Sequence, residues 1–351
     1  MALSSKLFRP IVSCGVALAI GVGGYQFFEA QKAQNIEKQR YGTYGQRIAE
    51  LRGLASGDVC NRAVARELTG LLIACDQTKE AAEALDVAVG NCPFDLGLSE
   101  LSARLWRKSG YLQRALAISE VMVKERPMMA AGYAVRAGVR FDLGRTRDAI
   151  ADYRQVFEFQ RGNVEAARAL TDALESGGNP CEAADVLDQM LARRRPDDAE
   201  WLESRSRRLR LAGACPRERV EGGEAIVPFS LDSEVMLVRV RFNNRLDATM
   251  VLDTGASAVT LTRDFALRLG LSLDDGEPYY VSTAGGAAVA YRVLIDEVRM
   301  GGAKVKRVGA AIVPNMQLGD SIDGLLGNTF LSHFRVKVDS ASRHVVLETL
   351  D

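Results

Sequence analysis

The residues best suited to chemistry form a short turn in the last third of this 351-residue chain. Asp253 follows an apolar run, residues 249–252, and precedes Thr254, Gly255 and Ser257. A strand that ends at Asp253 fixes the position of one carboxylate. The Thr254 hydroxyl can tie down the turn, and Gly255 permits backbone angles and close approaches that a Cβ blocks. The pattern therefore predicts a carboxylate that acts as an acid or a base at a turn.

Two later segments have the composition to support and cover such a turn. Residues 322–331 contain Leu325, Leu326 and Gly327 and lead into a predicted short helix. Residues 281–291 read as a strand, a glycine-rich tip and a returning strand, which predicts a hairpin. Its tip consists of Thr283, Ala284, Gly285 and Gly286. This tip is interpreted either as a plain hairpin turn or as a mobile segment that covers the site.

In these motifs, residues 224–351 resemble the aspartic proteases of retroviral type, the retropepsin-like family. The resemblance implies an all-β, single-lobe acid-protease domain in which the segment Leu325, Leu326 and Gly327 passes behind the catalytic turn. It also implies that the hairpin is a flap over the substrate.

One lobe of this type supplies one carboxylate, whereas the family hydrolyses peptide bonds with two. The resemblance therefore implies a symmetric homodimer through the protease domain, with Asp253 of each subunit meeting its mate. It also implies that Thr254 forms hydrogen bonds across the dimer. Ser257 is expected to orient the carboxylate within its own subunit. An alternative hypothesis keeps the lobe monomeric and places a second carboxylate such as Asp323 near the site.

The remaining sequence offers no competing chemistry. His333 and His344 lack a neighbouring cluster of Cys or carboxylates at metal-ligand spacing, so no metal and no cofactor is expected. The chain has no phosphate loop and no dinucleotide fingerprint. The 45 basic residues balance 45 acidic ones, which argues against a nucleic-acid partner.

The N-terminus predicts a membrane anchor. Lys6 and Arg9 precede residues 11–28, which contain no charge and are long enough to cross a bilayer as a helix. The basic residues indicate a cytoplasmic N-terminus, with everything after residue 30 on the other side. Residues 1–30 are therefore expected to be a cytoplasmic tail and an uncleaved transmembrane signal anchor. A cleaved signal peptide is the alternative.

Between anchor and protease the sequence repeats every 34 residues. The same position is occupied by Ala81, Ala115, Ala149 and Ala183, and a glycine lies five residues before the last three of them. This resembles the tetratricopeptide repeat, an all-α solenoid of helical hairpins. Residues 41–215 are expected to form the solenoid, which binds a protein partner or serves as a passive spacer. Residues 216–223 are polar and read as the linker.

Five cysteines lie in the repeats and none in the protease domain. In the repeat frame, Cys60 and Cys92 fall at one end of a hairpin, and Cys181 and Cys215 at a common end of a later one. The frame therefore predicts these two disulfides and leaves Cys75 free. Five buried thiols are the alternative.

Together these patterns predict a single-pass protein of a bacterial inner membrane, with the repeats and the protease domain facing the periplasm. Its expected function is that of an aspartic endopeptidase acting on a protein or peptide substrate. The competing hypothesis is a non-catalytic adaptor whose protease-like domain dimerises or binds peptides.

Overall fold

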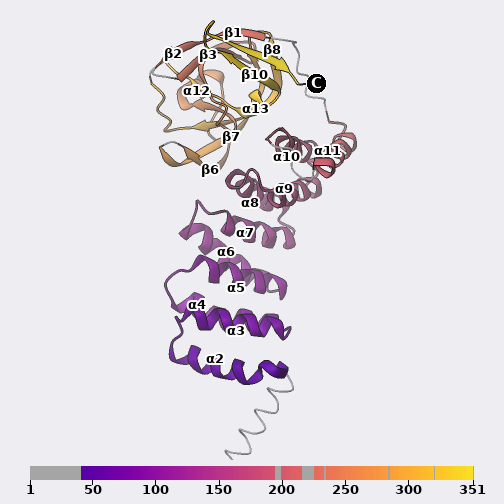
Figure 1. Cartoon of the computed structure of the whole chain (residues 1–351), viewed down its shortest axis with the longest axis vertical. Coiled ribbons are helices and arrows are strands. Elements are labelled where there is room, and N and C mark those ends of the chain that lie inside the picture. Colours follow the sequence, from indigo (N-terminus) through magenta and orange to yellow (C-terminus); the bar gives the residue numbers. More distant parts are fainter. Residues whose placement is uncertain are drawn as a thin grey trace, which may run out of the picture. The chain divides into compact units, whose positions relative to one another are not determined.

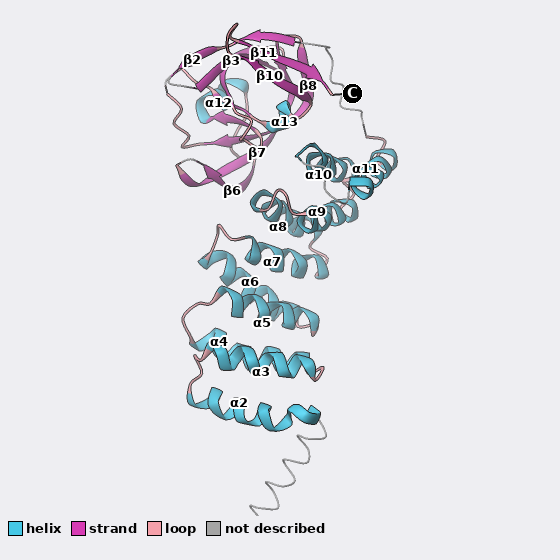
Figure 2. Ribbon diagram, in the orientation of Figure 1, coloured by secondary structure: helices cyan, strands magenta, loops and turns pink. Residues whose placement is uncertain are grey.

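The computed structural model describes residues 41–193, 199–215, 225–232, 235–274, 276–283, 285–319 and 321–350. The expected anchor (residues 11–28), the expected linker (residues 216–223) and Ala284 lie outside these ranges. Of the helices that are described, none combines the length and the apolar character needed to span a membrane. Figure 2 distinguishes an all-helical part from a part built mainly of strands.

The helical part is a tetratricopeptide-like array of short helices of similar length (Figure 1). It begins with a 3-10 turn, η1 (Gly42–Tyr44). The α-helices that follow are α2 (Gly45–Gly57), α3 (Arg62–Ala74), α4 (Thr78–Asn91), α5 (Leu96–Lys108), α6 (Leu112–Glu125), α7 (Ala130–Asp142), α8 (Thr146–Phe159), α9 (Val164–Ser176), α10 (Pro180–Arg193) and α11 (Ala199–Ala212).

The repeat spacing explains where these helices end and how they pack. The four alanines of the 34-residue frame lie in α4, α6, α8 and α10 and are fully buried. A small side chain at this position allows neighbouring helices to approach closely. Gly110, Gly144 and Gly178 follow α5, α7 and α9 with φ of +81°, +73° and +76°. This left-handed conformation ends a helix at little cost when the residue is glycine.

The chain forms two compact units, Met1–Glu125 and Arg126–Asp351. The first contains α2 to α6 and a disulfide between Cys60 and Cys92. Cys75 is a free thiol there, and its Sγ donates a hydrogen bond to the Tyr41 carbonyl. The second unit contains α7 to α11 and the strands.

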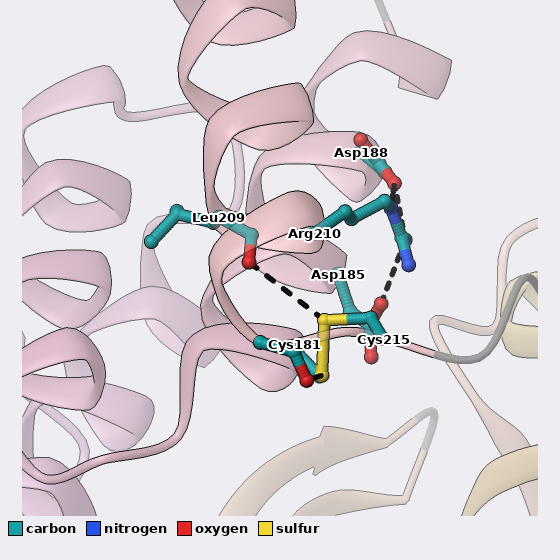
Figure 3. Close-up of a disulfide and its surroundings, with 7 residues drawn as sticks. Cys181, Asp185, Asp188, Leu209, Arg210 and Cys215 are labelled. Carbon is teal, nitrogen blue, oxygen red and sulfur yellow. Dashed lines mark hydrogen bonds and ion pairs between the residues drawn. A yellow bond between two sulfur atoms is a disulfide. The ribbon is translucent and has the colours of Figure 1, made fainter.

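A disulfide between Cys181 and Cys215 joins the start of α10 to the residue that follows α11 and its turn. Its Cα atoms are 5.4 Å apart, as are those of the first bridge. Figure 3 shows the bridge beside Arg210, which lies between Asp185 and Asp188. The two bridged pairs are those that the repeat frame predicts.

The strands form the β domain, which also carries two short helices. Its elements are β1 (Ala225–Pro228), β2 (Ser230–Asp232), β3 (Val235–Phe242), β4 (Leu246–Leu252), β5 (Val259–Thr262), α12 (Arg263–Leu269), β6 (Glu277–Thr283), β7 (Gly286–Met300), β8 (Ala303–Val313), β9 (Gly324–Leu326), α13 (Asn328–Leu331), β10 (Phe334–Asp339) and β11 (His344–Thr349).

These strands make two sheets around one apolar core. The larger sheet has the order β2-β3-β4-β9-β5-β8-β7-β6, with an added pairing between β3 and β7, and the smaller has the order β1-β11-β10. Most pairs are antiparallel, but β4 runs parallel to β9 and β5 runs parallel to β8. Phe242 and Phe265 pack edge to face at the centre of the core, with centroids 5.1 Å apart. This arrangement places β9 between β4 and β5, next to the turn that follows β4.

Candidate functional site: a carboxylate turn in the β domain

Asp253 lies at the end of the buried strand β4, on the turn predicted from sequence. Its N–H donates to the Leu326 carbonyl at 3.2 Å. Its Oδ1 accepts hydrogen bonds from the N–H groups of Gly255 at 2.8 Å and Ala256 at 3.1 Å. A Cβ at position 255 would lie 3.1 Å from the same oxygen. The turn therefore holds the carboxylate through two backbone amides and favours glycine at the position that approaches it.

The segment of β9 lies directly behind this turn. Leu325 and Leu326 pair in parallel with Val251 and Leu252, the two residues before Asp253. A Cβ on Gly327 would lie 2.2 Å from the Ala258 carbonyl oxygen. Real Cβ atoms do not approach an oxygen so closely, so the contact requires glycine. Leu325, Leu326 and Gly327 thus buttress the turn as expected from the motif.

Two residues that we did not include in the sequence-based site also hold the turn. The Asn328 side-chain amide donates to the Thr254 carbonyl at 2.9 Å, and the Thr329 hydroxyl accepts from the Val259 N–H at 2.8 Å. The sequence offers one indication of such roles, because Asn and Thr side chains at the start of a helix often form hydrogen bonds with nearby backbone groups. Here their partners are instead 74 and 70 residues away, which local patterns do not reveal.

Among the described residues, backbone amides and not the Ser257 hydroxyl orient the Asp253 carboxylate. No hydrogen bond joins Ser257 to Asp253 in the described part of the chain, and the Gly255 and Ala256 amides both donate to Asp253 Oδ1. The Thr254 side chain and Gly255 are exposed in the single chain. Their exposure leaves one side of the turn open to a further partner.

Asp323 does not lie beside Asp253. Its carboxylate accepts from the Thr249 N–H at 2.9 Å and forms an ion pair with Arg268. The strand register places Asp323 next to Thr249, four residues before Asp253 on β4. Four residues of strand span about 13 Å. The hypothesis that Asp323 is the second catalytic carboxylate is therefore wrong, because it lies too far along the strand and is bound by other groups.

The predicted hairpin is formed by β6 and β7. Thr283 pairs with Gly286, and the Thr283 hydroxyl donates to the Gly286 carbonyl at 2.8 Å. Gly286 has a φ of +105°, which a residue with a Cβ adopts only at a cost. Gly285 lies in the turn between the strands. The hairpin tip thus has the small residues and the short connection that the sequence indicates.

A cavity of about 1110 Å³ reaches the turn through Ser257 and Ala258. It lies within the second compact unit, and most of its other lining residues come from α8, α10, β6, β7 and β8. Its charged lining includes Arg161, Asp185 and Lys306. Its volume slightly exceeds the roughly 300–1,000 Å³ that is usual for a small-ligand pocket.

Neither histidine is placed for metal chemistry. No group of three or more His, Cys, Asp or Glu residues within the described ranges is arranged to hold a metal ion. Burial lowers the pKa of His333, which favours its neutral form. His344 begins β11.

The fold and the site define a domain of aspartic-protease type, with one Asp-Thr-Gly turn per chain, attached to tetratricopeptide-like repeats. Residues 238–330 match the family model described as aspartyl protease. This match covers about a quarter of the chain and lies wholly within the β domain.

Individual proteins are similar to parts of the chain. An uncharacterised protein of Sinorhizobium sp., named for its position in the cobV 5' region, is 36% identical over 89 residues, which are 24% of this chain. The match spans 36% of that relative's length. A retropepsin-like aspartic protease from Rickettsia conorii is 25% identical, and the similarity covers 38% of this chain and 96% of that one with a TM-score of 0.30. YrrB, titled a TPR protein with an unusual peptide-binding site, is 13% identical, with coverage of 45% and 82% and a TM-score of 0.38.

Proposed function

We propose that this chain is an aspartic endopeptidase that hydrolyses peptide bonds with two Asp253 carboxylates, one from each subunit of a homodimer. The observation that carries the proposal is the intact Asp253 turn, held by the Gly255 and Ala256 amides and backed by β9. The match of residues 238–330 to the aspartyl protease model supports it. Asp323, the carboxylate considered within the lobe, is bound by Thr249 and Arg268, which supports a second subunit as the source of the missing group.

The proposed chemistry follows from two carboxylates in one site. Two such groups at close range do not both ionise readily, so they share one proton and titrate as a coupled pair. The ionised carboxylate takes a proton from a bound water, whose oxygen attacks the scissile carbonyl carbon. The protonated carboxylate gives its proton to the carbonyl oxygen. The first carboxylate then gives the proton that it took from water to the amide nitrogen, and the C–N bond breaks. One hydroxyl of the tetrahedral intermediate returns its proton to the second carboxylate as the new carboxyl group forms, which restores the pair.

The other parts of the site have roles in substrate binding. The hairpin of β6 and β7 serves as the flap, and the cavity beside Ser257 accommodates part of the peptide. The exposed Thr254 supplies hydrogen bonds across the dimer. The helical repeats recruit the substrate or a partner protein. In the competing proposal the chain is an adaptor, and the β domain dimerises or binds peptides without cleaving them.

We further propose that residues 11–28 anchor the chain in a bacterial inner membrane with the β domain in the periplasm. The order of Lys6, Arg9 and the uncharged run supports this orientation. The two disulfides are consistent with an oxidising compartment. A reporter fused after Asp351 should be active only when exported, and activity confined to the cytoplasm would exclude this topology.

The catalytic proposal is tested with the full chain and the near-isosteric change Asp253→Asn. Cleavage of a peptide library should fall at least about a hundredfold, because one acid or base contributes on the order of 10²–10⁴-fold. Asp264→Asn, an exposed aspartate on α12, is the matched control and should retain activity. Asp253→Asn mixed with wild type should lower activity further than dilution alone, since mixed dimers have one competent carboxylate.

Concentration distinguishes the shared site from a complete site in one chain. Specific activity should rise with enzyme concentration and level off above the dimer dissociation constant. Full specific activity in a demonstrably monomeric sample would contradict the shared pair. A wild-type chain that dimerises and cleaves nothing would favour the adaptor.

A further inference from the structure

A buried glutamine of the repeats is bonded to the strand that forms one arm of the flap hairpin. Gln155 lies on α8, and only 4% of its surface is exposed. Its Nε2 donates to the Tyr280 carbonyl at 2.9 Å, and its Oε1 accepts from the Tyr280 N–H at 2.8 Å. Both partners are backbone groups of one residue on β6. A residue of an antiparallel strand directs its N–H and C=O to the same side, so the amide replaces a neighbouring strand at this point.

The edge position of β6 explains why Tyr280 needs such a partner. The strand is the last in the order of the larger sheet and pairs only with β7 in the described part of that sheet. Its outward backbone groups are therefore unsatisfied by the sheet. Buried polar groups without partners are costly, and the side-chain amide satisfies both the strand and itself.

An ion pair flanks this contact. Arg154, the preceding residue of α8, binds Glu277 of β6 at 2.6 Å and also binds Glu182 of α10. On the next turn of the same helix, Glu158 lies 3.7 Å from Arg292 of β7, whose guanidinium stacks over the Tyr279 ring. One face of α8 thus contacts both strands of the hairpin.

The repeat frame shows that these residues depart from the pattern of their neighbours. The position of Gln155 is occupied by Val87, Val121 and Gln189 in the other repeats. Val87 and Val121 are 48% and 50% exposed, and Gln189 is also exposed. A position that is otherwise on the surface is therefore buried only where β6 covers it.

The charge at the preceding position is reversed as well. The other repeats carry Asp86, Glu120 and Asp188 there, whereas this repeat carries Arg154 opposite Glu277. The substitution changes an acidic position to a basic one in the repeat that faces an acidic residue of β6. Both changes occur side by side, in the repeat that meets the hairpin.

Helix α8 is held against α7 by buried ion pairs. Asp152 lies one turn before Gln155 and is buried, and it binds Arg136 and Arg140 of α7 at 2.7 Å each. These bonds hold α8 to α7, so the helix that contacts the hairpin is itself tied to its neighbour in the repeat.

We infer that Gln155 is a positioning residue for the flap, through which the repeat formed by α7 and α8 sets the conformation of β6. The inference rests on the proposed function for its effect on catalysis. A hairpin held at Tyr280, three residues before Thr283, needs less ordering when substrate binds. If the Gln155 bonds to Tyr280 are lost, the hairpin must be ordered when substrate binds. The entropic cost of that ordering weakens binding, which raises KM and leaves kcat almost unchanged.

The contact is tested first without any activity, in the full chain. Gln155→Met keeps the length and the apolar packing and removes both hydrogen bonds. Gln155→Ala removes the packing as well. Val121→Met, at the equivalent exposed position one repeat earlier, is the matched control. Hydrogen exchange in residues 277–283 should become about tenfold faster in both Gln155 variants and stay unchanged in the control. Unchanged exchange in Gln155→Met, with a native circular dichroism spectrum, would overturn the inference.

Kinetics then test the positioning role. With a cleaved peptide, Gln155→Met should raise KM about three- to tenfold with kcat within about twofold of wild type. Faster exchange with an unchanged KM would show that the contact is structural and would overturn the role in substrate binding. A fall in kcat at constant KM would do the same. If the wild type cleaves no peptide, the proposed function fails, while hydrogen exchange still decides whether Gln155 holds the strand.

Discussion

The repeats and the β domain maintain their structures with different interactions. In the repeats, buried polar side chains bond from helix to helix, as when Ser206 donates to Asp188 or Ser102 to Asp86. Two disulfides are added to these contacts. In the described part of the β domain, the side chains that are fully buried are apolar, and long-range backbone bonds hold the turns. A repeat contacts mainly its neighbours, so specific local contacts define it, whereas the β domain closes around one shared core.

Because the two regions rely on different interactions, different substitutions are expected to destabilise each of them. The two tryptophans, Trp106 and Trp201, both lie in the repeats, so fluorescence reports on the helices and not on the strands. Circular dichroism in the strand band reports on the β domain. The two signals distinguish damage to one region from damage to the other.

The largest effect is expected from Gly327→Ala. The new Cβ would lie 2.2 Å from the Ala258 carbonyl oxygen, and both partners belong to backbone that cannot move aside. The change should destabilise the β domain by about 4 kcal/mol or more and leave the tryptophan transition in place. Gly309→Ala is the control, since the nearest atom to its Cβ is 4.0 Å away. Equal melting temperatures of the β domain in Gly327→Ala and Gly309→Ala would contradict the close contact between Gly327 and the Ala258 carbonyl.

The second effect concerns the bridges. Replacing Cys60 and Cys92 by Ser, or Cys181 and Cys215, should lower the stability of the repeats by about 3 to 4 kcal/mol per bridge, from the loop-closure entropy of some thirty residues. Denaturant unfolding followed by fluorescence measures this, with Trp106 near the first bridge in sequence and Trp201 near the second. Cys75→Ser is the control because Cys75 is not bridged. A loss of strand signal before the helices unfold would contradict the separation of the two regions.

The smallest effect is a pH dependence from His333. Burial lowers its pKa below the ordinary value, so the unfolded state binds a proton at a higher pH than the folded state does. Its contribution to stability is therefore present above about pH 6.5 and is lost as the pH falls through the lower folded pKa. His333→Asn should make the fall in stability between pH 7 and pH 5 less steep, as measured by denaturant unfolding at a series of pH values. His344→Asn, at the only other histidine, serves as the comparison.

The sequence predicts the features that depend on local pattern. The 34-residue period places the buried alanines and the helix-ending glycines, and from that frame follow the pairs Cys60 with Cys92 and Cys181 with Cys215. The Asp253 turn, the Gly327 segment and the hairpin also follow from short motifs whose steric requirements are strict. The membrane anchor, the dimer and the cleavage reaction stay predictions.

The features that the sequence did not reveal depend on partners far along the chain. Asn328 holds Thr254, and Gln155 holds Tyr280 across 125 residues, and no local spacing encodes either contact. In the described part of the chain the backbone amides of Gly255 and Ala256, and not the Ser257 hydroxyl, donate to the Asp253 carboxylate. The sequence does contain one indication of the contact with β6. At the repeat position of Arg154 the other repeats carry an acidic residue, and a comparison of these positions would have revealed the change.

The side-chain amide on the edge of β6 also affects how this protein meets other copies of itself. An open strand edge is a template for pairing with a strand of another chain, and such pairing leads to aggregation. Gln155 occupies the outward N–H and C=O of Tyr280, and Pro278 lacks an N–H to offer. The contact therefore protects the hairpin against indiscriminate strand addition at its base and confines any added strand to the tip.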